Sequence, residues 1–154
     1  MAEMFHFWTH GVNVVPEFTK EYTGTNNGLV LRPMGFGTSI RQNAGTDNWF
    51  HMAIPSGTKL DGDSVRIRSA WLRLSASGGP MVDQVNIHEA SGPGAESNRI
   101  HESGALNVSR GGTQLNFNLG SRPAAGPLVM SIHAVFNGHG EIIIAGAGAQ
   151  FDEL

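Results

Sequence analysis

The strongest constraint on the fold is an alternation of apolar and polar side chains with a period of two residues. In the run NWFHMAIP, Phe50, Met52 and Ile54 fall on one face of an extended chain. Trp49 and His51 fall on the opposite face, because successive side chains of a strand point in opposite directions. Apolar residues with helical spacing are nearly absent, whereas Gly and Pro recur between the alternating runs. This pattern predicts short β-strands separated by turns.

Alternating runs predict strands in the segments 4–10, 12–15, 29–32, 35–40, 48–54, 64–77, 81–90, 113–119, 127–137 and 140–151. The segments 77–80 and 138–140 are rich in glycine, so we expect the chain to reverse direction at both. The longest run changes phase near Ser69 and Ala70, which predicts a β-bulge there. Near the end of the chain, Gly146 and Gly148 leave one strand face without side chains, so we expect an aromatic ring or a backbone to approach it closely.

These elements indicate an all-β protein, with an antiparallel β-sandwich or jelly roll as the expected fold. A closed β-barrel is the alternative. The length of 154 residues suits one domain over residues 1–154. The 21 glycines and the low charged fraction of 15% fit many tight turns between strands.

Composition also limits the expected partners and location. The net charge of −3 argues against a nucleic-acid partner. No apolar run reaches the roughly 20 residues that span a bilayer, so no membrane partner is expected. The start of the sequence lacks a basic segment and the chain has no cysteine, which together predict a cytoplasmic protein.

Several short motifs resemble those of a family of bacterial single-domain proteins of unknown function. They are Trp8-Thr9-His10-Gly11, Gly35-Phe36-Gly37-Thr38, Asn48-Trp49-Phe50-His51 with Ile54-Pro55, Val65-Arg66-Ile67-Arg68, Arg99-Ile100, Leu106-Asn107-Val108-Ser109 and Ala147-Gly148-Ala149-Gln150-Phe151. The resemblance covers nearly the whole chain and implies one all-β domain, but no activity. The chain departs from the family at residues 85–90, VNIHEA, where the family tends to read Val-His-Val-Tyr-Asp-Gly.

The candidate binding residues are Trp8, His10, Trp49 and His51. Each tryptophan is two residues from a histidine, so strand alternation places the two side chains of each pair on the same face of their strand. Neighbouring strands would join the two tryptophans into an aromatic platform. Such a platform with polar side chains at its rim is suited to a sugar ring or another planar ligand. The alternative is that Trp8 and Trp49 belong to the core or to a subunit interface. We expect no cofactor and a binding protein for a small molecule or glycan.

Two other functions remain open from the sequence. Low charge and aromatic strand faces suit a homo-oligomeric assembly protein, in which strand edges would pair. Seven histidines also allow a cupin-like metal-dependent enzyme or a cyclase that uses histidine for acid–base chemistry. For a divalent metal, the candidate ligands are His10, His51 and His88, contributed by different strands. Whether the chain is an enzyme is left undecided by these residues.

Overall fold

The computed structural model describes residues 4–22, 25–94 and 97–154. The elements are β1 (Met4–His10), the 3₁₀ turn η1 (Gly11–Asn13), β2 (Val15–Pro16), β3 (Glu21–Tyr22), β4 (Thr25–Asn26), β5 (Val30–Met34), β6 (Gly37–Arg41), β7 (Thr46–Ile54), β8 (Lys59–Leu60), β9 (Asp63–Ala90), β10 (Ser97–Glu102), β11 (Gly111–Pro123) and β12 (Leu128–Glu153). Among these described residues, no helix has the length and apolar character needed to cross a bilayer.

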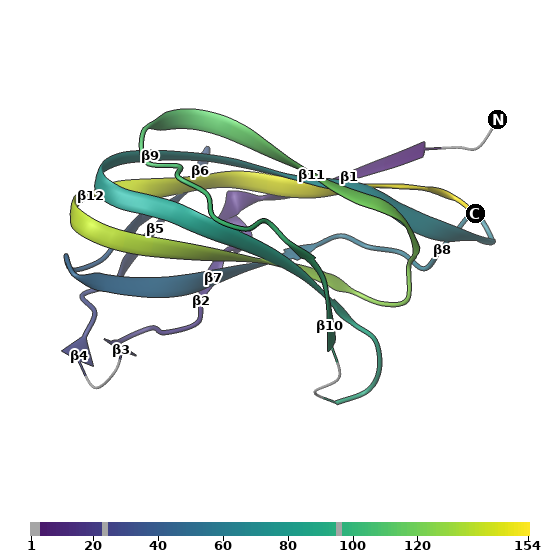
Figure 1. Cartoon of the computed structure of the whole chain (residues 1–154), viewed down its shortest axis with the longest axis horizontal. Helices are drawn as coiled ribbons and strands as arrows, with labels where there is room; N and C mark the ends of the chain where they lie inside the picture. Colours follow the sequence, from purple (N-terminus) through teal and green to yellow (C-terminus); the bar gives the residue numbers. More distant parts are fainter. Residues whose placement is uncertain (1–3, 23–24, 95–96) are drawn as a thin grey trace.

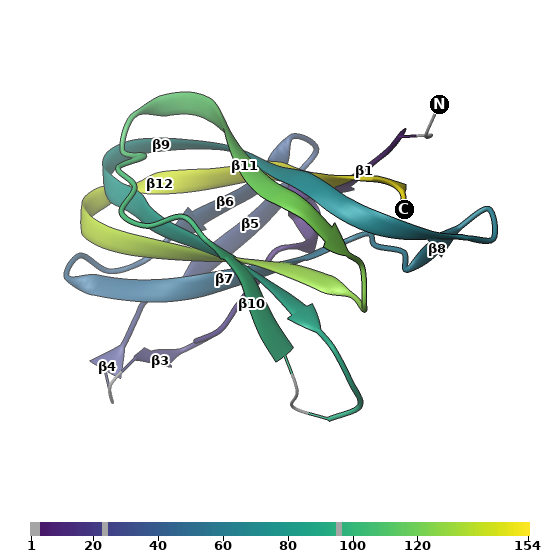
Figure 2. The same ribbon diagram turned by 45° about the vertical axis from the view of Figure 1, so that its right-hand side comes forward.

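Two long antiparallel strands, β9 and β12, form the frame of the molecule. They pair along nearly their whole length, from Leu128 opposite Glu89 to Glu153 opposite Val65. Figures 1 and 2 show both strands curving back at one end of the molecule, so that their two halves belong to two stacked layers. The protein is therefore an antiparallel β-sandwich made from one curled sheet, as the alternation predicts.

The bend in this frame lies at the two glycine-rich segments for which the sequence predicts chain reversals. Gly79 lies so close to the partner strand that an added Cβ would be 2.3 Å from the backbone nitrogen of Gly138. An added Cβ at Gly140 would lie 2.0 Å from the carbonyl oxygen of Ser77. The predicted turn at 77–80 and the predicted hairpin at 138–140 are therefore wrong: each glycine segment lets one continuous strand bend against the other.

Shorter strands extend each half of the frame. In the first layer, β7 pairs with residues 128–136 of β12, β2 pairs with β7, and β10 pairs with the end of β9. In the second layer, β1 and β6 pair one after the other along the same edge of β12, β5 pairs with β6, and β11 pairs with the first half of β9. In the described chain β5, β10 and β11 each pair with one strand, so the sheet keeps free edges and the barrel alternative is not adopted.

The core lies between the two layers and contains the residues that alternation assigns to it. Phe50 and Met52 on β7 belong to the same buried cluster as Phe151 and Ile67 of the other layer, and all four are almost fully buried. The predicted bulge is confirmed close to its expected place. Gln150 pairs with Ser69 whereas Phe151 pairs with Ile67, which leaves Arg68 as the extra residue and restores one inward face to β9.

Candidate functional site

The four predicted binding residues divide between the two outer faces of the sandwich. Trp8 and His10 lie on β1, opposite Gly148 and Gly146 in the second layer. Trp49 and His51 lie on β7, which pairs with the other half of β12 in the first layer. The expectation that the two tryptophans form one platform is therefore wrong, because β1 and β7 flank different halves of a bent strand.

The outer face of the second layer is built around the bare stretch of β12. An added Cβ at Gly148 would lie 2.4 Å from Nε1 of Trp71 and 2.4 Å from the carbonyl oxygen of Phe7. Trp71 is the residue paired with Gly148 on β9, and its indole occupies the space that a side chain at 148 would need. The predicted close approach is confirmed at both glycines: an aromatic ring and a backbone approach Gly148, and at Gly146 an added Cβ would lie 2.8 Å from the carbonyl oxygen of Thr9.

Trp71 supports Trp8. The two ring centroids lie 5.1 Å apart with the planes tilted by 45°, and the imidazole of His6 meets Trp71 edge-on at 5.3 Å. Trp71 is 8% exposed, whereas Trp8 keeps 43% of its surface open to solvent. We call Trp8, Trp71 and Arg73 the Trp8 platform, because the Arg73 guanidinium carbon lies 4.4 Å from the Trp8 ring centroid as a cation–π contact.

Polar side chains continue the platform along β11. Arg73 donates from Nε to the Gln114 side-chain oxygen at 2.8 Å, and Gln114 in turn donates to Asn116 at 3.0 Å. Asn116 is the residue paired with Trp71. The outer face thus combines an exposed indole with fixed amide and guanidinium groups, which is the combination needed to stack on a sugar ring and bond its hydroxyls.

One buried polar atom of the platform has no partner within the described residues. Nε1 of Trp71 is inaccessible to solvent and makes no hydrogen bond. An unpaired buried donor costs about 1–3 kcal/mol. That cost accompanies the placement of Trp71 over Gly148, where the ring gives Trp8 its support.

His10 has both ring nitrogens occupied by the backbone. Its Nδ1 accepts from the N–H of Val12 at 3.0 Å, and its Nε2 donates to the carbonyl oxygen of Gly35 at 2.9 Å. The hydroxyl of Thr38 donates to the carbonyl oxygen of Gly11 at 2.8 Å. The WTHG and GFGT motifs therefore interlock, and His10 fastens the β5–β6 hairpin beside the platform rather than offering a free imidazole.

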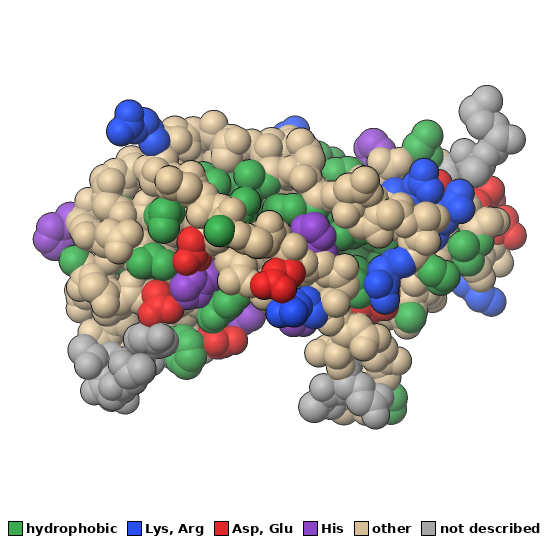
Figure 3. Space-filling model, viewed as in Figure 1, with side chains coloured by type: hydrophobic (Ala, Val, Ile, Leu, Met, Phe, Trp, Pro, Cys, Tyr) green, Lys and Arg blue, Asp and Glu red, His purple; other side chains and the backbone are tan. Residues whose placement is uncertain are grey.

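On the opposite outer face, Trp49 packs on a histidine that is held by two carboxylates. The rings of Trp49 and His133 lie 4.8 Å apart. His133 is bonded through Nδ1 to Asp83 and through Nε2 to Asp47, both at 2.6 Å. Burial alone would lower the pKa of His133, but the hydrogen bonds and charges of the two aspartates outweigh it, and the pKa is raised above its ordinary value. Figure 3 shows acidic and histidine side chains gathered on this side of the molecule.

His51 and His88 line a shallow depression of about 550 Å³ further along the same face. His51 Nε2 lies 3.1 Å from the carboxylate of Glu17, and its Nδ1 lies 2.8 Å from the hydroxyl of Ser131. Burial lowers the pKa of His88, and the nearby charges of Arg99 and His51 add to this effect. The Ser131 hydroxyl, the His51 imidazole and the Glu17 carboxylate form a connected series that can pass a proton, which is the chemistry that the enzyme alternative requires.

The three candidate metal ligands do not come together, because His10 lies on the other outer face. Across residues 4–22, 25–94 and 97–154, no group of three or more His, Cys, Asp or Glu side chains is placed to hold a metal ion.

The sequence prediction missed Trp71 and Arg73, which complete the platform. Both lie beyond the bulge in β9, where the parity of the strand changes. The glycines of β12 could have pointed to these two residues, since a large side chain on a neighbouring strand must cover a glycine in a well-packed sheet. Trp71 pairs with Gly148, and Arg73 pairs with Gly146.

The sequence matches no model of a known protein family and no curated protein. The resemblance to the bacterial family therefore stays a prediction. Solved structures of similar fold include carbohydrate-binding modules. A variant of a family 29 module superposes with a TM-score of 0.51 at 12% identity, covering 97% of this chain and 93% of the other. A low-affinity xylan-binding module from Roseburia intestinalis superposes with a TM-score of 0.50 at 9% identity, covering 94% of each chain. At these identities the likeness shows the β-sandwich fold.

Proposed function

We propose that this protein is a non-enzymatic glycan-binding β-sandwich and that its binding site is the Trp8 platform. The observation that carries the proposal is the partly exposed indole of Trp8, which packs against Trp71 and has the Arg73 guanidinium over its ring. An indole face provides apolar contact area for the C–H groups of a sugar, and the guanidinium and amide groups bond its hydroxyls.

Two further observations support this assignment. The solved modules of similar fold named above bind carbohydrate, and one of them binds xylan. The unpaired N–H of Trp71 is a local cost of the kind that is concentrated at functional sites. Within the part of the chain that the structure describes, no unpaired buried donor lies beside Trp49, whose ring instead contacts His133 and so the charged cluster that His133 forms with its two aspartates.

The test is affinity electrophoresis of the purified chain through gels that contain soluble polysaccharides, followed by calorimetry on those that retard it. Truncation of a central aromatic anchor costs about 2 kcal/mol, so Trp8→Ala is expected to weaken binding about 30-fold. Trp49→Ala is the matched control on the other face and is expected to change affinity less than two-fold. Retained binding in Trp8→Ala together with loss in Trp49→Ala would move the site to the opposite face.

Exposed apolar side chains favour self-association as a second candidate function. Met4, Val15 and Val30 are each more than half exposed and lie on or beside strands at the sheet edges. Such edges are available for pairing with another copy of the chain. Native mass spectrometry tests this candidate, because a clean multiple of 16.4 kDa at micromolar concentration supports it and a monomer at high micromolar concentration opposes it.

A further inference from the structure

The Trp8 platform lies at one end of a row of three open depressions, which we call the groove. Three neighbouring depressions follow the outward positions of β12, and each shares lining residues with the next. The first contains Trp8, His10 and Gly146 and shares Arg73 and Ala145 with the second. The second shares Phe36 and Ile143 with the third, which continues to Arg32, Arg41 and Glu141.

The row is too long for a single sugar ring. Its lining residues on β12 run from Gly146 to Glu141, and a strand rise of about 3.3 Å per residue makes this about 17 Å. A groove of that length suits several consecutive units of a chain-like ligand. The middle section is mostly apolar, with Leu74 and Ile143 among its lining residues.

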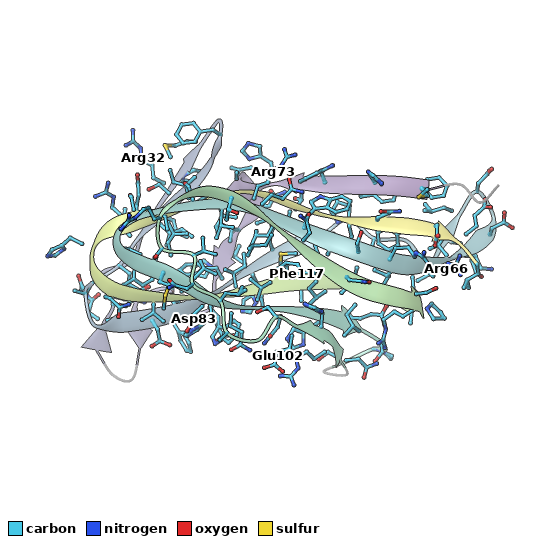
Figure 4. All side chains as sticks on the ribbon, turned by 45° about the horizontal axis from the view of Figure 1, so that its top comes forward. Arg32, Arg66, Arg73, Asp83, Glu102 and Phe117 are labelled. Atoms are coloured by element: carbon cyan, nitrogen blue, oxygen red, sulfur yellow. The ribbon has the colours of Figure 1, made fainter. Side chains whose placement is uncertain are left out.

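The groove is positively charged on a chain whose net charge is −3. Arg41 is paired with Glu141 at 3.5 Å, but Arg32 and Arg73 have no carboxylate partner within the described residues. Figure 4 shows Arg32 and Arg73 on the same side of the molecule, away from Asp83 and Glu102 on the opposite side. Two arginines without counter-charges on one groove favour an anionic ligand, and the guanidinium fork matches the geometry of a carboxylate.

Phe36 offers a second aromatic surface in the same groove. It occupies the tip of the β5–β6 hairpin and is 62% exposed. The hairpin is held in place by His10 bonded to Gly35 and by Gly37, where an added Cβ would lie 2.4 Å from the carbonyl oxygen of Ile144. A large apolar side chain kept in solvent on a fastened hairpin, between two depressions, is suited to stack on a ligand that passes it.

We propose that the ligand is a linear polysaccharide that carries carboxylates along its chain, and that it lies in this groove from Trp8 past Arg73 to Phe36 and Arg32. This inference rests on the proposed function and specifies its substrate class. Trp8 and Phe36 stack on sugar rings of the chain, while Arg73 and Arg32 bind uronate carboxylates between and beyond them.

The test compares polygalacturonate with a neutral linear xylan, by calorimetry on the wild-type chain and on single variants. Polygalacturonate is expected to bind at least ten-fold more tightly than xylan, with affinity falling as salt is added. Galacturonate oligomers are expected to gain affinity up to a length of several units. Arg32→Ala and Phe36→Ala, both distant from Trp8 along the groove, are each expected to weaken polygalacturonate binding about five-fold or more. Arg99→Ala removes an arginine from the opposite face and is expected to leave it unchanged.

The results separate this inference from the proposed function. Equal binding of xylan and polygalacturonate, abolished by Trp8→Ala but insensitive to Arg32→Ala and Phe36→Ala, would overturn the acidic, extended ligand and leave the platform as a glycan site. A galacturonate monomer that binds as tightly as the long oligomers would likewise overturn the groove. Failure of every polysaccharide to bind would overturn both.

Discussion

Trp8 and Trp49 both project outward from strands that flank β12, yet they have different surroundings. Opposite Trp8 the long strand carries Gly148, and the vacant space admits Trp71 from the next strand. Opposite Trp49 it carries His133, which fills the same kind of space and binds Asp47 and Asp83. The residue on the central strand thus decides whether a neighbouring tryptophan gains an aromatic support or a charged one.

The two faces consequently differ in what they can offer a ligand. The Trp8 face has an exposed ring and polar groups whose hydrogen-bonding capacity is only partly used. On the Trp49 face, the imidazole and the carboxylates already satisfy one another. A comparison of matched substitutions on the two faces can test this difference.

The largest effect is expected from Gly148→Val. The added Cβ would overlap both the Trp71 indole and the carbonyl oxygen of Phe7, neither of which can move freely. Overpacking of this kind costs about 3 kcal/mol, so the urea midpoint of unfolding is expected to fall clearly. Gly35→Ala is the control, since an added Cβ there has no atom within 4 Å. Equal urea midpoints for the two variants would show that the placement of the Trp71 indole does not require a glycine at position 148.

A smaller, pH-dependent effect is expected from His133→Leu. Loss of the imidazolium leaves Asp47 and Asp83 without their shared partner, which we expect to cost about 2 kcal/mol near pH 6, below the cost of breaking a fully buried pair. Burial lowers the pKa of His133, yet the two aspartates raise it overall. The folded state therefore binds the proton more tightly than the unfolded state does. The stabilisation is complete below the ordinary pKa of 6.5 and is lost as the pH rises through the raised pKa.

Urea unfolding of wild type and His133→Leu at pH 6 and pH 9 measures this dependence. The difference in free energy of unfolding is expected to be larger at pH 6 than at pH 9. His139→Leu, a substitution of an exposed histidine near the bend of β12, is the control and is expected to give a small difference at both values. A difference that grows with pH would mean that His133 is neutral in the folded protein.

Local patterns in the sequence predict much of this fold. The alternation gives the strands and their inward faces, the change of phase gives the bulge beside Ser69, and the spaced glycines of β12 give a place for close approach. The bend could not be predicted in the same way. Glycine at 78, 79, 138 and 140 is typical of a reversing turn, and only the pairing of the two segments shows that each strand continues through its glycines.

The candidate site was less predictable because its parts come from strands that are distant in sequence. Parity identifies Trp8 and Trp49 as outward residues, but parity carries no information about which half of β12 a strand joins. Trp71 and Arg73 lie after the bulge in β9, so the direction of their side chains depends on the register of β9 against β12. That register places Trp71 opposite Gly148, on the part of β12 that also pairs with β1. His10 looks like a candidate ligand in the sequence, and only its two backbone partners show that it is a positioning residue.

The smallest expected effect comes from a comparison of His10 and His51, each of which lies two residues after a tryptophan. Loss of a hydrogen bond such as that from His10 to Gly35 costs about 1 kcal/mol, and its consequences are confined to the hairpin that it fastens. His10→Ala is therefore expected to speed hydrogen exchange of the amides at residues 35–41 and to leave β7 protected. His51→Ala removes a histidine of the other face and is expected to leave the exchange of this hairpin unchanged. Faster exchange across the whole chain in His10→Ala would contradict a local role, and unchanged exchange at 35–41 would show that Gly37 and Thr38 hold the hairpin without it. If the local effect is found, the same variant also weakens any ligand contact made by Phe36, because the hairpin that presents this ring is then less firmly placed beside Trp8.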